Sequence, residues 1–162
     1  MQLFYEPGLA SNLDFWYSFI MKQEINDFLK SQSIAVITVM MPDGSPHSAS
    51  IHYAHNDDLW FFFGTAQATL KSDALHAAEA VKASLVIGFD QATMRTLQLH
   101  GEARLLNPNE NDLFTQVYSI KFPHVPVNNM DPKNVYFVFT PTWWRYSDFK
   151  HPDGKLVLSS AD

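Results

Sequence analysis

The 162-residue sequence contains no cysteine, which excludes disulfide cross-links, thiolate nucleophiles and zinc–thiolate sites. Basic residues are few: eleven Lys and Arg stand against seventeen Asp and Glu, and the formal net charge is −6. Nucleic acid and anionic membrane surfaces are therefore not expected as partners. Long apolar runs are also lacking, so we expect no membrane-spanning segment.

The N-terminus lacks a basic segment followed by an apolar core, the pattern of a secretory signal, so we expect cytoplasmic localisation. Hydrophobic residues make up 46% of the chain and charged residues 17%, which is the composition of an ordinary globular protein. The length suits one domain. We therefore expect a single domain over residues 1–162, with its core at about 22–150.

The apolar pattern predicts a mainly β protein of the α+β class. Strands are expected at 33–41, 48–55, 59–63, 83–89, 97–106, 134–139, 142–149 and 156–158. Helices are expected from residue 12 or 14 to about 30, from 69 or 72 through 81, and from 107 through 118. Short turns such as Asp43-Gly44 favour hairpins between consecutive strands. Six or more such strands indicate an antiparallel barrel with helices packed outside.

The stretch FGTAQATLK at 63–71 carries the most informative chemical pattern. A strand ends there, and a loop of small residues leads into a helix that begins near Thr69 and Lys71. The free N–H groups of a helix N-terminus, together with hydroxyl and ammonium donors, bind anions such as phosphate. The same residues also fit a threonine N-cap followed by a solvated surface lysine. Spacing alone leaves both interpretations open.

The order of motifs along the chain resembles that of the pyridoxamine 5′-phosphate oxidase-like family of FMN-binding split β-barrels. The matching segments are AVITV at 35–39, DGSP at 43–46, SASI at 48–51, FFFGT at 61–65, TLK at 69–71, LQLHGEA at 97–103 and PTWWRY at 141–146. The resemblance extends over about residues 22–150. It implies an antiparallel split barrel in which FMN lies across a homodimer interface.

The resemblance also implies which positions form the site. The positions that match the family's cofactor-binding residues are Ser48, Ala49, Ser50, Ile51, Gly64, Thr65, Thr69, Leu70, Lys71, Thr96 and Gln98. Trp144 and Arg145 would face the substrate. The implied activity is that of an FMN-dependent oxidoreductase, with hydride transfer between the flavin and a small organic substrate or a reduced nicotinamide. No general acid or base is evident, and none is assigned.

Two positions depart from the family pattern. Ala49 stands where many members carry an arginine that pairs with the FMN phosphate, and Leu70 stands where a second arginine is common. The C-terminal residues also lack the arginine-rich tail of the true oxidases, so vitamin B6 oxidation is not expected. Two alternatives stay open: a flavin-binding carrier or sensor without turnover, and a degenerate split barrel that binds haem or a deazaflavin.

Histidines and tryptophans could also bind a metal ion or another ligand. His52 and His55 are three residues apart, which places them on opposite faces of a strand, so no metal site is expected. Trp143 and Trp144 are adjacent, so one side chain is expected to fill the core. The other would lie at a dimer interface or over a ligand.

Overall fold

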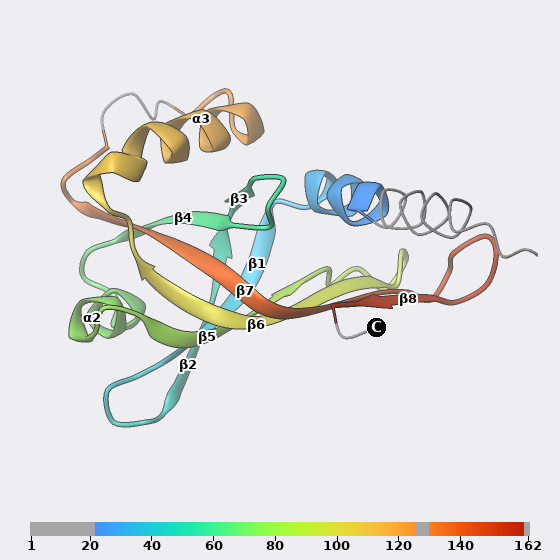
Figure 1. Ribbon diagram of the computed structural model, residues 1–162, viewed down its shortest axis with the longest axis horizontal. Helices are drawn as coiled ribbons and strands as arrows, with labels where there is room; N and C mark the ends of the chain where they lie inside the picture. Colours follow the sequence, from blue (N-terminus) through green and yellow to red (C-terminus); the bar gives the residue numbers. More distant parts are fainter. Residues whose placement is uncertain (1–21, 126–129, 161–162) are drawn as a thin grey trace, which may run out of the picture.

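The computed structural model describes residues 22–125 and 130–160, and Figure 1 shows their arrangement. A helix occupies residues 22–31, while the earlier part of the expected first helix lies outside the described residues. The remaining elements are β1 (Ile34–Met40), β2 (Pro46–His52), β3 (Ala54–His55), β4 (Phe61–Ala66), α2 (Leu70–Ala77), β5 (Val81–Ile87), β6 (Arg95–Leu105), a 3-10 turn (Pro108–Glu110), α3 (Asn111–Lys121), β7 (Asn134–Asp148) and β8 (Leu156–Ser159).

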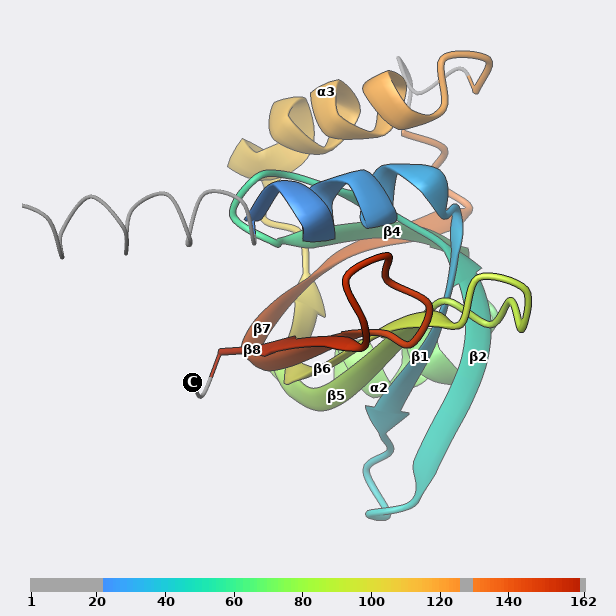
Figure 2. The same cartoon turned by 90° about the vertical axis from the view of Figure 1, so that its right-hand side faces the viewer.

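The eight strands form one antiparallel sheet in the order β2-β1-β5-β6-β7-β4-β3, with β8 paired to β7. The two ends of this order, β2 and β3, are separated in the chain by Tyr53 alone. The chain can pass from one end of the order to the other within one residue only because the sheet curls round on itself (Figures 1 and 2). The structure confirms the expected α+β split barrel.

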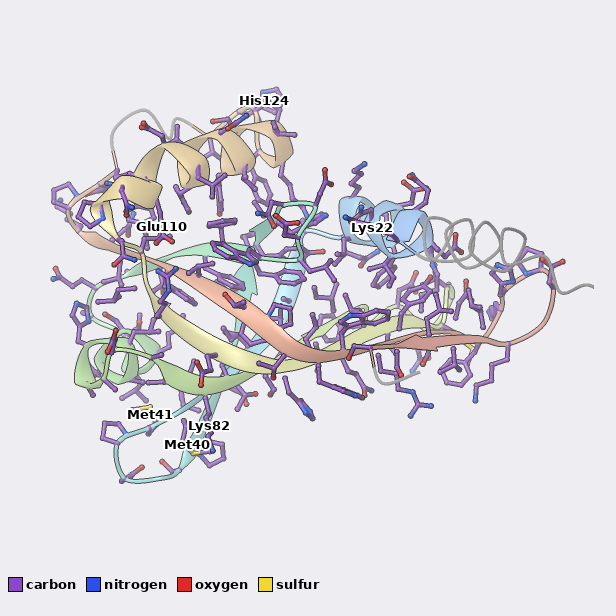
Figure 3. All side chains as sticks on the ribbon, in the orientation of Figure 1. Lys22, Met40, Met41, Lys82, Glu110 and His124 are labelled. Atoms are coloured by element: carbon purple, nitrogen blue, oxygen red, sulfur yellow. The ribbon has the colours of Figure 1, made fainter. Side chains whose placement is uncertain are left out.

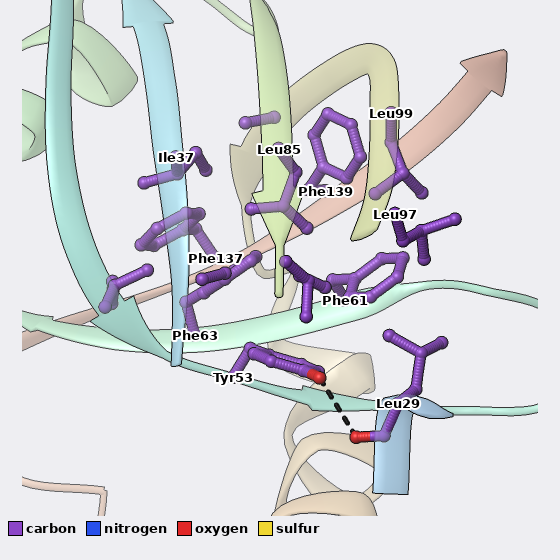
Figure 4. Packing of buried hydrophobic residues seen from close by; sticks show 14 of the residues in the cluster. Leu29, Ile37, Tyr53, Phe61, Phe63, Leu85, Leu97, Leu99, Phe137 and Phe139 are labelled. Carbon is purple, nitrogen blue, oxygen red and sulfur yellow. Dashed lines mark hydrogen bonds between the residues drawn. The ribbon is translucent and has the colours of Figure 1, made fainter. Parts of the chain in front are cut away.

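The inside of the barrel is filled by alternate residues of its strands. Figure 4 shows part of this cluster, in which the rings of Phe63 and Phe137 stack with centroids 4.8 Å apart. The helix at 22–31 adds Ile25, Phe28 and Leu29 to the cluster, and α2 adds Ala74 and Leu75. Helix α3 packs differently, because it covers the outside of β4 and β7 through a second cluster.

That second cluster is centred on Phe62, Phe114 and Val138. The start of α3 is held by Glu110, whose carboxylate accepts two hydrogen bonds from the Arg104 guanidinium at 2.6 and 2.7 Å (Figure 3). The same carboxylate accepts a hydrogen bond from the backbone N–H of Asn107 at 2.9 Å, as expected for a capping residue. This bidentate pair ties the end of β6 to α3.

Several expected boundaries were wrong by about two residues, and three larger differences have a clear structural reason. Strand β4 does not stop at Gly64 but continues to Ala66, because Gly64 pairs with Tyr136 and leaves room for that ring. Helix α2 ends at Ala77 rather than Val81, because Ala78 is extended, and Val81 instead begins β5. The expected strand over 48–55 is divided at Tyr53 into β2 and β3, since the two halves pair with different neighbours.

The expected break at Pro141 was also wrong. Strand β7 runs unbroken through Pro141, and the irregularity is a β-bulge: Gly101 of β6 faces Pro141, while His100 faces Trp143. The extra residue is Thr142, and a bulge is one of the few places in a sheet that accommodates proline. The bulge therefore shifts by one residue the alternation of inward-facing and outward-facing side chains along β7. Phe139 points inward before it, whereas Trp144 and Tyr146 point inward after it.

The close approach of the two strands at the bulge requires glycine. A β-carbon at Gly101 would collide with the Thr140 carbonyl oxygen and lie 2.8 Å from the Cα of Pro141. We expect Gly101→Ala to lower the free energy of unfolding by about 3 kcal/mol, because these backbone atoms cannot move aside cheaply. Ser84→Ala, on the strand next to β6, should change stability by less than about 0.5 kcal/mol. Urea unfolding followed by circular dichroism measures both; equal stabilities would contradict the role given to the bulge.

Candidate functional site

One side of the sheet is left uncovered by the described helices. We define this outer face by two rows of residues that cross β2, β1, β5, β6 and the second half of β7. Within each row, residues on neighbouring strands are paired directly. The first row is Ser50, Val36, Val86, Gln98 and Arg145; the second is Ser48, Thr38, Ser84, His100 and Trp143. None of the ten is buried, although most lie in the middle of a sheet. Such a face is available to a ligand or to another chain.

The structure brings several of the family-implied positions together on the outer face. Gln98 lies directly opposite Arg145, and both belong to the row that ends at Ser50. Ser48 belongs to the second row, and its hydroxyl is 2.8 Å from that of Thr38. Thr96 is half-buried and pairs with Ser147 at the end of the face.

Ala49 and Ile51 do not present side chains to the outer face. They alternate with the two serines, and Ile51 is 8% exposed within the barrel cluster. Only their backbone atoms could contact a ligand on the outer face. Trp144 also faces inward, where it packs against the barrel cluster.

The tryptophan turned outward is Trp143, which we had not assigned to the site. Its ring lies against that of His100, with centroids 4.8 Å apart. Sequence reasoning missed six residues of the outer face: Val36, Thr38, Ser84, Val86, His100 and Trp143. No sequence signal separates Trp143 from Trp144, because the bulge decides which of them faces out.

The loop from Gly64 to Lys71 shares no strand pairing with the two rows, because β4 pairs with the first half of β7. Thr65 is half-buried at the end of β4, and Leu70 is 55% exposed at the start of α2. Thr69 is the N-cap of α2. Its hydroxyl accepts a hydrogen bond from the Ser72 N–H at 3.3 Å and donates one to the Ala66 carbonyl at 3.1 Å. The Thr69 hydroxyl is therefore already used by the helix itself.

Lys71 has no such internal partner. Within residues 22–125 and 130–160, its ammonium makes no hydrogen bond or ion pair. The side chain is half-buried, and burial lowers the pKa of the ammonium from its ordinary value. An ammonium that is partly desolvated and unpaired next to a helix N-terminus fits a phosphate, because the anion would restore the lost solvation.

The described residues contain no group of three or more His, Cys, Asp or Glu side chains arranged to hold a metal ion. In the same part of the chain, no helix is long and apolar enough to cross a membrane.

The closed antiparallel sheet and its uncovered outer face define the class of protein as a split β-barrel. A family model described as pyridoxamine 5′-phosphate oxidase matches residues 21–148. The chain therefore belongs to the pyridoxamine 5′-phosphate oxidase family.

Solved structures of other proteins share this fold. A conserved hypothetical protein from Mycobacterium tuberculosis is 22% identical, with a TM-score of 0.64 over 79% of this chain and 84% of that one. A protein from Clostridium acetobutylicum related to general stress protein 26 is 19% identical, with a TM-score of 0.60 over 86% and 94% of the two chains. The haem storage protein of Vibrio cholerae is 14% identical, with a TM-score of 0.60 over 74% and 88%. No curated protein matches by sequence.

The capping role of Thr69 can be measured separately from any role in ligand binding. Thr69→Ala removes the acceptor of the Ser72 N–H, so we expect it to lower the free energy of unfolding by about 1 kcal/mol. Thr69→Ser keeps the hydroxyl and should retain most of that stability. Chemical denaturation without ligand measures both variants. If Thr69→Ala were as stable as the parent protein, the hydroxyl would not act as the cap.

Proposed function

We propose that this protein is a homodimeric FMN-dependent oxidoreductase whose outer face, paired with that of a second copy, encloses the flavin. The observation that carries the proposal is the outer face itself, a sheet surface that none of the described helices covers, in a chain of the pyridoxamine 5′-phosphate oxidase family. Polar and apolar side chains are both accessible to a ligand or a partner chain on this surface.

The apolar part of this surface supports the dimer. Ile34 and Met40, at the two ends of β1, are 44% and 41% exposed, and Figure 3 places Met40 near the β1–β2 hairpin. Between them, Val36 of β1 and Val86 of β5 are only half-buried in the middle of the sheet. A second copy would remove this apolar surface from water and complete a closed site.

The residues available for FMN fall into three groups, each suited to a different part of the site. Ser48, Ser50 and Gln98 would offer hydroxyl and amide groups to the ring and the ribityl chain. Lys71 and the first N–H groups of α2 would hold the phosphate. Arg145, opposite Gln98, would supply a cation on the side where a small substrate enters.

A bound flavin would supply the hydride chemistry, while the chain orients it and excludes water. Ala49 points inward and carries no charge, so the phosphate would depend on one ammonium rather than on an arginine fork. A point charge holds phosphate less tightly than a bidentate guanidinium. The expected FMN affinity is therefore moderate.

The phosphate role of Lys71 can be tested by comparing FMN with riboflavin, which lacks the phosphate. We expect Lys71→Met to weaken FMN binding about tenfold, since one charge-assisted contact contributes roughly 1.5–3 kcal/mol. Riboflavin binding should not change. Lys155→Met is the matched control, because Lys155 immediately precedes β8, and β8 lies at the opposite end of the molecule from α2 in Figure 1. Quenching of flavin fluorescence measures each affinity; an equal loss for both flavins would contradict the phosphate role.

A second candidate function is haem binding on the same outer face. It is favoured by His100, an exposed imidazole whose ring lies against that of Trp143 at a tilt of 32°. An imidazole can ligate haem iron, and an indole can stack on the porphyrin. A structural neighbour from Vibrio cholerae is a haem storage protein, and another from Mycobacterium smegmatis is a haem-binding protein.

Haem binding through His100 makes a spectroscopic prediction. Titration with hemin should give a sharpened Soret band that is lost in His100→Ala. His76→Ala is the control, because His76 is exposed on α2, where its Nδ1 donates a hydrogen bond to the Ser72 carbonyl at 2.8 Å. A hemin spectrum that is the same in His100→Ala and in the parent protein would rule out His100 as the ligand.

A further inference from the structure

A cavity of about 570 Å³ lies away from the outer face and from the 64–71 loop. It is enclosed by the end of the helix at 22–31, by β3 and the turn after it, and by α3. This volume is in the range of sites for small organic molecules. The views in Figures 1 and 2 agree that α3 and the helix at 22–31 lie on the same side of β4.

The wall that α3 contributes carries an apolar stripe beside two polar residues, Gln116 and Lys121. Leu113, Val117 and Ile120 fall three or four residues apart, so they form one stripe along the helix. Ile120 is 77% exposed, the highest value among the large apolar side chains that the structure describes as exposed. Ile120 therefore lies at the solvent-facing end of this stripe, which we call the open end of the cavity.

The inner end of the cavity is positively charged. The Lys121 ammonium donates a hydrogen bond to the Leu29 carbonyl at 2.9 Å and lies 3.6 Å from the centroid of the Tyr53 ring. Among the described residues it forms no ion pair, although Asp57 also lines the cavity. Burial lowers the pKa of Lys121 to about 7. Lys30 supplies a second ammonium at the same end.

His55 completes this end of the cavity without adding charge. Burial, assisted by Lys121 and Lys30, lowers the pKa of its imidazole to about 4, so the ring is neutral at pH 7. Its buried Nδ1 makes no hydrogen bond within the part of the chain that the structure describes. The cavity therefore has two ammonium groups and one carboxylate, with an apolar stripe leading out.

We propose that this cavity binds a small monocarboxylic acid with an apolar body, its carboxylate on Lys121 and its body along the α3 stripe. One of the three N–H groups of an ammonium is used by Leu29, and the remaining ones can serve a carboxylate. A doubly charged phosphate would fit less well, since it would also meet Asp57.

Carboxylate binding should be coupled to a proton. The desolvated Lys121 amine is partly neutral above pH 7, and an anion beside it favours the charged form. Lys30 and Asp57 are the other charged groups that line the cavity, and the lowered pKa of His55 keeps its imidazole neutral at this pH. Binding of the acid at pH 8 should therefore take up a fraction of a proton.

Isothermal titration calorimetry with hexanoate tests the proposal. At pH 8 we expect binding whose heat differs between two buffers of different protonation enthalpy, and no binding of hexan-1-ol. Lys121→Met should weaken hexanoate at least tenfold and remove the buffer dependence, while Lys155→Met should match the parent protein. Equal affinity in Lys121→Met, or equal binding of hexanoate and hexan-1-ol, would overturn the proposal.

A second variant covers the case in which Lys121→Met fails to fold. Ile120→Glu places a carboxylate at the open end, on a side chain that is already exposed, so the fold should tolerate it. We expect Ile120→Glu to lose hexanoate binding through charge repulsion, whereas Ile120→Gln should retain it. Retention in both would show that hexanoate does not occupy this cavity. FMN binding should be unchanged in each variant, so this test is separate from that of the flavin site.

Discussion

The closure of the barrel at Tyr53 is the constraint on which the rest of the structure depends. Tyr53 joins the two ends of the strand order, and its side chain is fully buried. A buried phenol needs a hydrogen-bond partner, which it finds in the Leu29 carbonyl at 3.0 Å (Figure 4). The closing residue is thereby tied to the helix at 22–31, and Lys121 lies over its ring from α3. One side chain thus fixes two helices relative to the sheet.

Closure also gives the two faces of the sheet different surroundings. The inner face is filled with aromatic and branched side chains, and the ends of its cluster are covered by α2 and the helix at 22–31. It has no room for a cofactor. Helix α3 covers the outside of β4 and β7, which leaves β1, β2, β5 and β6 as the uncovered region. This uncovered region and the loops that border it are where we propose that FMN binds.

Much of the fold could be predicted because it follows from alternation and from turn chemistry. Strand β1 and the capped start of α3 lie where the pattern placed them, since each depends on residues close in sequence. The orientation of Trp143 and Trp144 could not be predicted, because a bulge produced by Gly101 on another strand decides it. The cavity at Lys121 could not be predicted either, because its residues are distant in sequence and meet only after closure at Tyr53.

The cations of this acidic chain distinguish structural roles from ligand-binding roles. Arg104 is paired with Glu110 in two short hydrogen bonds, so its charge is satisfied within the protein. Lys71 and Lys121 are partly desolvated and, among the described residues, have no carboxylate partner, although acidic residues outnumber basic ones by seventeen to eleven. Desolvating an ammonium without pairing it costs stability, and exposed lysines avoid that cost. These two lysines are therefore the cations to which we assign the two proposed anions, a phosphate at Lys71 and a carboxylate at Lys121.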